Sequence, residues 1–102
     1  MEVGDHLLVL VTYDIKTTTK DGRKRIRKIA KICLNYGQRV QNSVFECVIN
    51  WDQFIELKKE LKAVIDVKED SLRFYRLGKG YKGKVEHIGT KEVLDLEGPL
   101  IF

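Results

Sequence analysis

The sequence has few of the residues from which metal sites, redox centres and covalent active sites are usually built. Its 102 residues include two cysteines, two histidines and one proline. Cys33 and Cys47 are too far apart for a short zinc or redox motif, and His6 and His87 are isolated from each other. We therefore expect two reduced core cysteines and surface histidines, with no disulfide framework.

Long hydrophobic runs are also missing. The apolar stretch near the start, residues 7–11, is much too short to cross a membrane. Residues 1–6 lack the basic region that opens a secretory signal. These features predict a cytoplasmic protein with no membrane partner. A chain of this length forms one domain with a modest core, which a second copy would help to bury.

Positive charge is present and unevenly distributed. The net charge is +4, and residues 50–70 mix both signs as solvated helices usually do. Residues 20–31 contain only one acid, Asp21. The basic residues in that segment are Lys20, Arg23, Lys24, Arg25, Arg27, Lys28 and Lys31. Such a one-sided run favours an anionic partner, most commonly phosphate.

The apolar pattern predicts alternating strands and helices. Strands are expected at 7–14, within 38–49 as a hairpin turning at Gln41-Asn42, and at 71–77. One helix should run over 22–36, capped by Asp21 and ended by a left-handed Gly37. A second should run over 51–65, opened by an Asn50/Gln53 capping box. A short edge strand is expected at 91–96.

This order predicts an α+β fold, the ferredoxin-like βαββαβ sandwich with both helices on one sheet face. Residues 1–78 would form the core domain, and the basic loop and tail at 79–102 would complete a dimer. Because residues 7–11 do not alternate, the face without helices should also be covered. A second copy is the simplest cover, with the C-terminal strand swapped onto it.

Asp14 ends the first strand, where an ionised group is costly to bury. One interpretation is that it caps the following turn, "IKTTT". The other is that two copies of Asp14 meet near a dimer axis and share one Mg²⁺ or Mn²⁺. A metal held there could bind a phosphodiester and activate water.

Other apparent motifs lack the context that they need. "GKGYKG" at 78–83 is not followed by the helix that a dinucleotide or phosphate-binding loop requires. Ser43 has no neighbouring base in the sequence that could make it a nucleophile. The strand "NSVFECVI" has one aromatic residue, unlike the aromatic-rich strand of an RNA-recognition module.

The segments "LVTYDI" (10–15), "GRKRIRKIAKICLNYGQRVQNSVFEC" (22–47) and "LDLEGPLIF" (94–102) resemble CRISPR-associated protein 2, the partner of the spacer-acquisition integrase. The variant is similar to those of subtype I-C systems. The resemblance implies a homodimer, a Mg²⁺-dependent endonuclease activity on RNA or double-stranded DNA, and the integrase as partner. The alternative role in this family is a non-catalytic DNA scaffold that bridges integrase dimers.

The resemblance also implies roles for particular residues. Asp14 of both chains would be the catalytic metal ligand, and supporting residues would lie near it: Tyr13, Ser43, Phe45 and Glu46. The residues implied to approach the nucleic-acid backbone, together with lysines of the same basic run, are Arg23, Lys24, Arg25, Arg27, Lys28 and Arg39.

Overall fold

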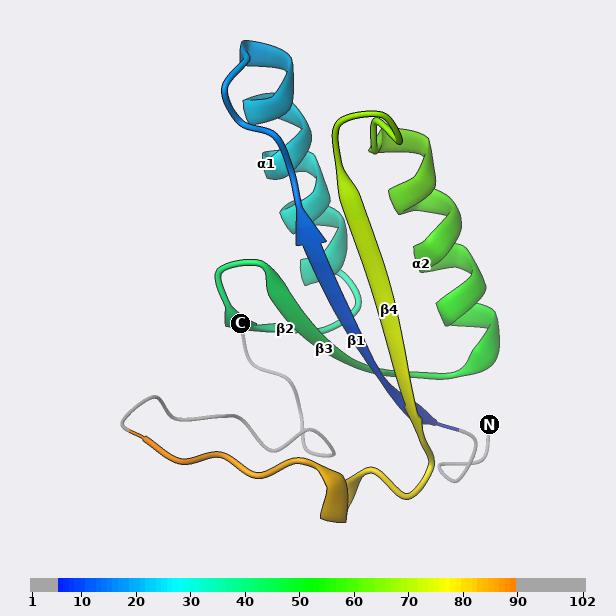
Figure 1. Cartoon of the computed structure of the whole chain (residues 1–102). Coiled ribbons are helices and arrows are strands. Elements are labelled where there is room, and N and C mark those ends of the chain that lie inside the picture. The colour runs from blue at the N-terminus through cyan, green and yellow to red at the C-terminus, as the bar shows by residue number, and fades with distance from the viewer. Residues whose placement is uncertain (1–5, 90–102) are drawn as a thin grey trace.

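The computed structural model describes residues 6–89, which form a four-stranded antiparallel sheet with two helices on one face (Figure 1). The strands are β1 (Leu7–Asp14), β2 (Gln38–Gln41), β3 (Val44–Ile49) and β4 (Ser71–Gly78). The helices are α1 (Lys20–Leu34), α2 (Trp51–Val64) and a short 3₁₀ helix, η2 (Lys82–Lys84). The strand order β2-β3-β1-β4 confirms the predicted ferredoxin-like α+β fold. The edge strand expected at 91–96 lies outside the described residues.

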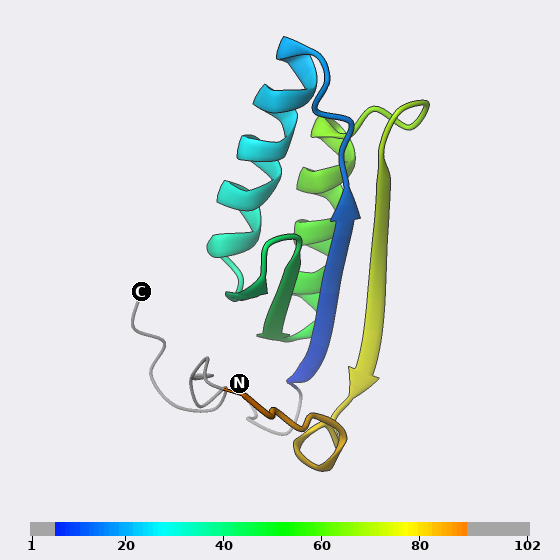
Figure 2. The ribbon, with the colours of Figure 1, turned by 60° about the vertical axis from the view of Figure 1, so that its left-hand side comes forward.

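The apolar run at the start of the chain forms the centre of the sheet. β1 lies between β3 and β4, and its odd-numbered residues from Val9 to Tyr13 join the core beneath the helices. Its even-numbered residues, from Leu8 to Asp14, face the opposite side, which carries no helix (Figure 2). The exposure of the side chains on that side rises along the strand: Leu8 is fully buried, and Asp14 is exposed.

Two predictions about the ends of α1 are wrong in detail. Thr19, and not Asp21, is the N-cap, and its hydroxyl oxygen accepts a hydrogen bond from the Gly22 amide at 3.0 Å. Gly37 has no positive φ, because the helix ends at Asn35 in right-handed geometry. Gly37 is required for a different reason: a Cβ there would lie 2.2 Å from the Glu46 carbonyl oxygen. The glycine therefore permits the close approach of the chain to β3.

The second helix begins as predicted. The Gln53 amide donates to the Asn50 side-chain oxygen at 2.8 Å, and the Asn50 amide donates to the Gln53 side-chain oxygen at 2.9 Å. Phe54 is buried, but Trp51 is not the inward-facing residue that the pattern predicted, since it is 49% exposed. Its ring lies at the edge of the sheet, where the Arg76 guanidinium stacks 5.6 Å from it. A cation over the ring covers one face of this side chain.

The two cysteines are buried and unbonded, as expected. Burial raises the pKa of both thiols to about 12, so they are protonated and unreactive at neutral pH. Within residues 6–89, no helix is both long and apolar enough to cross a membrane.

Candidate functional site

Asp14 lies at the last position of β1, on the sheet face that carries no helix. Its Cα partner across the ladder is Ser71, the first residue of β4. The side chain is exposed, and its carboxylate makes no hydrogen bond or ion pair with another described residue. The turn-capping interpretation therefore finds no hydrogen bond in the described structure. An unpaired carboxylate at a strand end is free to meet a ligand.

The β2–β3 hairpin turn reaches the same end of β1. The Ser43 carbonyl oxygen accepts a hydrogen bond from the Tyr13 amide at 3.2 Å. The Tyr13 hydroxyl in turn donates to the Asn42 carbonyl at 3.3 Å. These contacts bring Ser43 beside the strand end through its backbone. Its side chain makes no hydrogen bond with another described residue, so no base is bound to it and a structural role fits it best.

Three other predicted residues support the strand end from the core side. Tyr13 stacks on Phe45, with ring centroids 6.2 Å apart and an interplanar angle of 24°. The Arg39 guanidinium lies 5.1 Å from the centre of the Phe45 ring. Burial raises the pKa of Tyr13, which keeps its hydroxyl protonated. All three side chains lie on the helix-bearing face, away from the Asp14 carboxylate.

Glu46 shares the face of Asp14 but not its position. Its ladder partner is Leu10, so it lies about 13 Å further down the sheet from the level of Asp14. The residue is 8% exposed, and its Oε1 has no hydrogen-bond partner. Burial raises the pKa of this carboxyl. It borders a cavity of about 580 Å³ between residues 40–42 and residues 85–88. Within one chain, Glu46 therefore cannot bind the same ion as Asp14.

The donor set of a single chain is too small to enclose a metal. Among the described residues, no group of three or more histidine, cysteine or acidic side chains is arranged to hold one. Mg²⁺ needs fewer protein ligands, because it is usually bound by one or two carboxylates and completed by water and phosphate. An exposed, unpaired Asp14 fits such an open site, and a second copy would supply the second carboxylate.

Arg73 is a site candidate that the resemblance did not indicate. Its Cα partner across the ladder is Thr12, so it lies on the face of Asp14, close to the same strand end. It is exposed, and its Nη1 contacts the Tyr75 hydroxyl at 3.1 Å. The strict alternation of residues 71–77 could have revealed it, because that alternation puts Arg73 on the face without helices.

Four cations line the outer side of α1, and we call them the α1 cationic stripe. They border a shallow groove of about 390 Å³, are all exposed, and have no ion pair with a described residue. The members are Lys24, Arg27, Lys28 and Lys31. Their spacing puts them on one face, opposite the buried Ile29 and Cys33. The stripe therefore faces away from the sheet, on the other side of the molecule from Asp14.

The remaining predicted cations of α1 are engaged within the chain. Arg25 binds the Asp70 carboxylate through two nitrogens, at 2.7 and 3.1 Å, and only 17% of its side chain is exposed. Arg23 is exposed and donates to the Thr17 carbonyl at 3.3 Å. Of these two, Arg23 could still exchange its contact for a phosphate. Arg25 is instead bound to Asp70 in this structure, and its predicted contact with a nucleic-acid backbone, which would require it to leave that carboxylate, stays a prediction.

The fold and these side chains define a small ferredoxin-like protein with an open carboxylate at one strand end and a cationic outer helix. The chain belongs to the family described as CRISPR associated protein Cas2, whose profile matches residues 7–85.

Named relatives are similar over nearly the whole chain. The chain is 62% identical over 96 residues to the CRISPR-associated endonuclease Cas2 of Halalkalibacterium halodurans, covering 94% of this chain and 100% of that protein. It is 58% identical over 96 residues, with the same coverage, to the CRISPR-associated endoribonuclease Cas2 of Chlorobaculum tepidum. A crystal structure of Streptococcus pyogenes Cas2 superposes with a TM-score of 0.71 at 55% identity, covering 80% of this chain and 99% of that one. The predicted family is confirmed, whereas the likeness to subtype I-C stays a prediction.

Proposed function

We propose that this protein binds nucleic acid as a homodimer in CRISPR adaptation and hydrolyses phosphodiester bonds of RNA or double-stranded DNA with Mg²⁺, which Mn²⁺ could replace. The carrying observation is the exposed carboxylate of Asp14, held at the end of a buried central strand without a described partner. Relatives named as an endonuclease and an endoribonuclease support a nuclease reaction.

The helix-free face of the sheet supports the dimer. It presents partly exposed apolar side chains, including Leu10, Val48 and Tyr75, beside the buried Leu8. Apolar groups on one sheet face gain free energy when a second layer removes them from water. A two-fold contact across this face would bring the two Asp14 residues toward each other. A homodimer with a swapped C-terminal strand therefore remains our expectation.

In this proposal, Asp14 from each chain holds the ion. When bound, the metal polarises a phosphoryl oxygen and lowers the pKa of a coordinated water. The protein's own contribution is a rigid platform. The buried β1 strand and the Tyr13 contacts fix the direction in which the carboxylate points. Arg73 lies on the same face as Asp14. In this proposal it would bind a phosphate group of the nucleic-acid strand that is being cleaved.

Removal of the metal tests the proposal directly. With EDTA present, we expect cleavage of end-labelled duplex DNA and single-stranded RNA to stop, and Mg²⁺ or Mn²⁺ in excess to restore it. Binding of the same molecules should persist in EDTA, because the cations of α1 and β4 need no metal. Cleavage products are quantified on denaturing gels and binding by fluorescence anisotropy. Cleavage that continues unchanged in EDTA would refute the metal-dependent mechanism.

A second candidate function is a non-catalytic scaffold that bridges two integrase dimers on DNA. The observation that favours it is the direction of the α1 cationic stripe, which faces away from the sheet surface that carries Asp14. DNA bound along the stripe would not have to reach Asp14. In this role the phosphate contacts are essential, and the carboxylate is dispensable.

Spacer acquisition in cells separates these two functions. We expect an Asp14→Ala strain to acquire new spacers at the wild-type rate if the scaffold is the cellular role, because the stripe and the fold are unchanged. If cleavage is the cellular role, acquisition should fall to the background of a strain that lacks the protein. Amplification of the leader end of the CRISPR array measures the rate, and immunoblotting controls for equal protein levels.

A further inference from the structure

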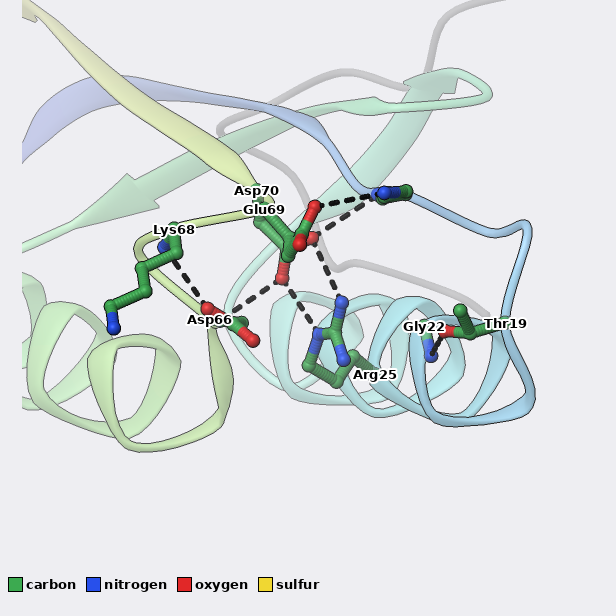
Figure 3. A network of polar contacts seen from close by, with 8 residues as sticks. Thr19, Gly22, Arg25, Asp66, Lys68, Glu69 and Asp70 are labelled. Carbon is green, nitrogen blue, oxygen red and sulfur yellow. Dashed lines mark hydrogen bonds and ion pairs between the residues drawn. The ribbon is translucent and has the colours of Figure 1, made fainter.

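The Asp70 carboxylate is the most heavily bonded acidic side chain among the described residues (Figure 3). It lies in the loop between α2 and β4, and its side chain is fully buried. Oδ1 accepts from the Lys16 amide and from an Arg25 terminal nitrogen, both at 3.1 Å. Oδ2 accepts from Arg25 Nε at 2.7 Å and from the Asp66 amide at 3.0 Å. A buried carboxylate with two bonds on each oxygen is fully satisfied.

Two of its neighbours adjoin Asp14, one along the chain and one across the sheet. Lys16 is the second residue after Asp14, and its amide is fixed by Asp70. Ser71, which follows Asp70, is the ladder partner of Asp14. The Lys16 carbonyl oxygen lies close to the start of α1, since a Cβ on Gly22 would be only 1.7 Å from it and glycine alone permits this approach. The backbone that leaves Asp14 is therefore hydrogen-bonded to Asp70 and packed closely against the start of α1.

Arg25 completes the arrangement by joining α1 to the same carboxylate. The Arg25 guanidinium beside Asp70 holds the pKa of that carboxyl below its usual range, so the pair is ionised at neutral pH. A two-nitrogen contact fixes orientation as well as distance. Three segments that are distant in sequence thus meet at one side chain: the chain after β1, helix α1 and the loop before β4.

We propose that Asp70, together with Arg25, is a positioning element that sets the place and direction of the Asp14 carboxylate. This inference rests on the proposed nuclease function, because it assigns a purpose to the network only if Asp14 binds the ion. Catalysis depends steeply on such placement: a shift of about 1 Å caused by a remote substitution can cost about 100-fold in rate. Neither Asp70 nor Arg25 touches substrate in this arrangement.

The test compares Asp70→Asn and Arg25→Ala with the wild type under saturating nucleic acid and Mg²⁺. We expect both to lower the cleavage rate constant by about 100-fold, with duplex affinity within about threefold of wild type. In both variants, Mn²⁺ binding to the protein alone should weaken when followed by electron paramagnetic resonance. The double variant should be no worse than either single one, because the two residues act as one unit.

Binding distinguishes this role from a nucleic-acid contact by Arg25. If Arg25 bound phosphate, Arg25→Ala would weaken duplex binding, whereas Asp70→Asn would release the arginine and leave binding equal or tighter. Opposite effects of that kind would overturn the inference. Glu69→Gln is the matched control: it removes one negative charge and an exposed ion pair with Lys16 from the same loop. It should leave the rate and Mn²⁺ binding unchanged.

A parallel Asp14→Ala sample separates failure of the inference from failure of the proposed function. If Asp14→Ala cleaves like the wild type, the nuclease assignment to this site is wrong. If Asp14→Ala is inactive while a folded Asp70→Asn is fully active and binds Mn²⁺ normally, the positioning role alone is wrong. Where Asp70→Asn does not fold, Arg25→Lys decides, because it keeps the ion pair but loses the two-nitrogen geometry. Wild-type rate and Mn²⁺ affinity in folded Arg25→Lys would then refute the role.

Discussion

Asp14→Ala is expected to reduce metal-dependent cleavage by at least about 1000-fold, because it removes the carboxylate that holds the ion in both chains. Metal activation of water and phosphate supplies several kcal/mol of transition-state stabilisation, and each 1.36 kcal/mol is tenfold in rate. The fold should survive, since the side chain is exposed and has no described partner. We expect the free energy of unfolding to change by less than about 0.5 kcal/mol. Single-turnover cleavage and thermal denaturation measure the two quantities.

A matched control removes the same charge elsewhere. Asp52 is an exposed aspartate in the first turn of α2, distant in the sheet topology from the end of β1. Asp52→Ala should cost stability slightly, since an acid at a helix N-terminus is favourable by about 0.3–1 kcal/mol. Its cleavage rate should match the wild type. A rate for Asp14→Ala within tenfold of that control, in protein purified free of other nucleases, would exclude Asp14 as the catalytic ligand.

The fold, and the place of Asp14 at the end of its central strand, could be predicted from the sequence because local pattern determines them. The continuous apolar run before Asp14 is typical of a central strand, and β1 is central. The order of the remaining elements then admits few topologies. Local pattern also left the exact end of a helix undecided. Thr19 and Asp21 are both good helix caps, and only the three-dimensional path of the loop shows that Thr19 is used.

The contact of Arg25 with Asp70 could not be predicted from the basic run alone. It lies on the inward side of α1 with Ile29 and Cys33, so helical spacing could have indicated that it differs from Lys24 and Lys28. Its binding partner, Asp70, is 45 positions away and follows an unremarkable polar loop. A contact between distant segments is decided by tertiary packing. Charge counts therefore overestimate how many cations in such a run are available to a ligand.

The surroundings of Glu46 could not be predicted from the sequence either. The resemblance grouped it with Ser43 and Phe45 near Asp14, but successive strand residues point to opposite faces. Phe45 lies in the core, Ser43 at the hairpin turn, and Glu46 beside the cavity bordered by residues 85–88. The resemblance thus implied one site for three residues that the sheet places apart within a single chain. The backbone of Ser43 reaches the end of β1 that carries Asp14, and Phe45 supports that end from the core side.

Neutralising the α1 cationic stripe is the second change with a large expected effect. The variant replaces Lys24, Arg27, Lys28 and Lys31 with glutamine. Each exposed cation near a phosphate contributes about 1 kcal/mol in water, so four together correspond to about 1000-fold in affinity. Each lost contact should also reduce the slope of log affinity against log salt by about 0.9, giving a change between 3 and 4 per chain. Anisotropy titrations with duplex DNA from 50 to 300 mM salt measure both quantities.

The loss of affinity could also come from the lower net charge of the variant and not from the lost stripe. A second variant with the same loss of charge tests that explanation. It replaces four exposed lysines of α2 and the following loop with glutamine: Lys58, Lys59, Lys62 and Lys68. Both variants lose four positive charges, and glutamine keeps good helix propensity in both. If the stripe binds phosphate, the α2 variant should keep most of its affinity and nearly its full salt slope, because its charges are interleaved with acids. Equal losses in the two variants would show that net charge, and not the stripe, determines the affinity, and that the stripe is only a solvated face.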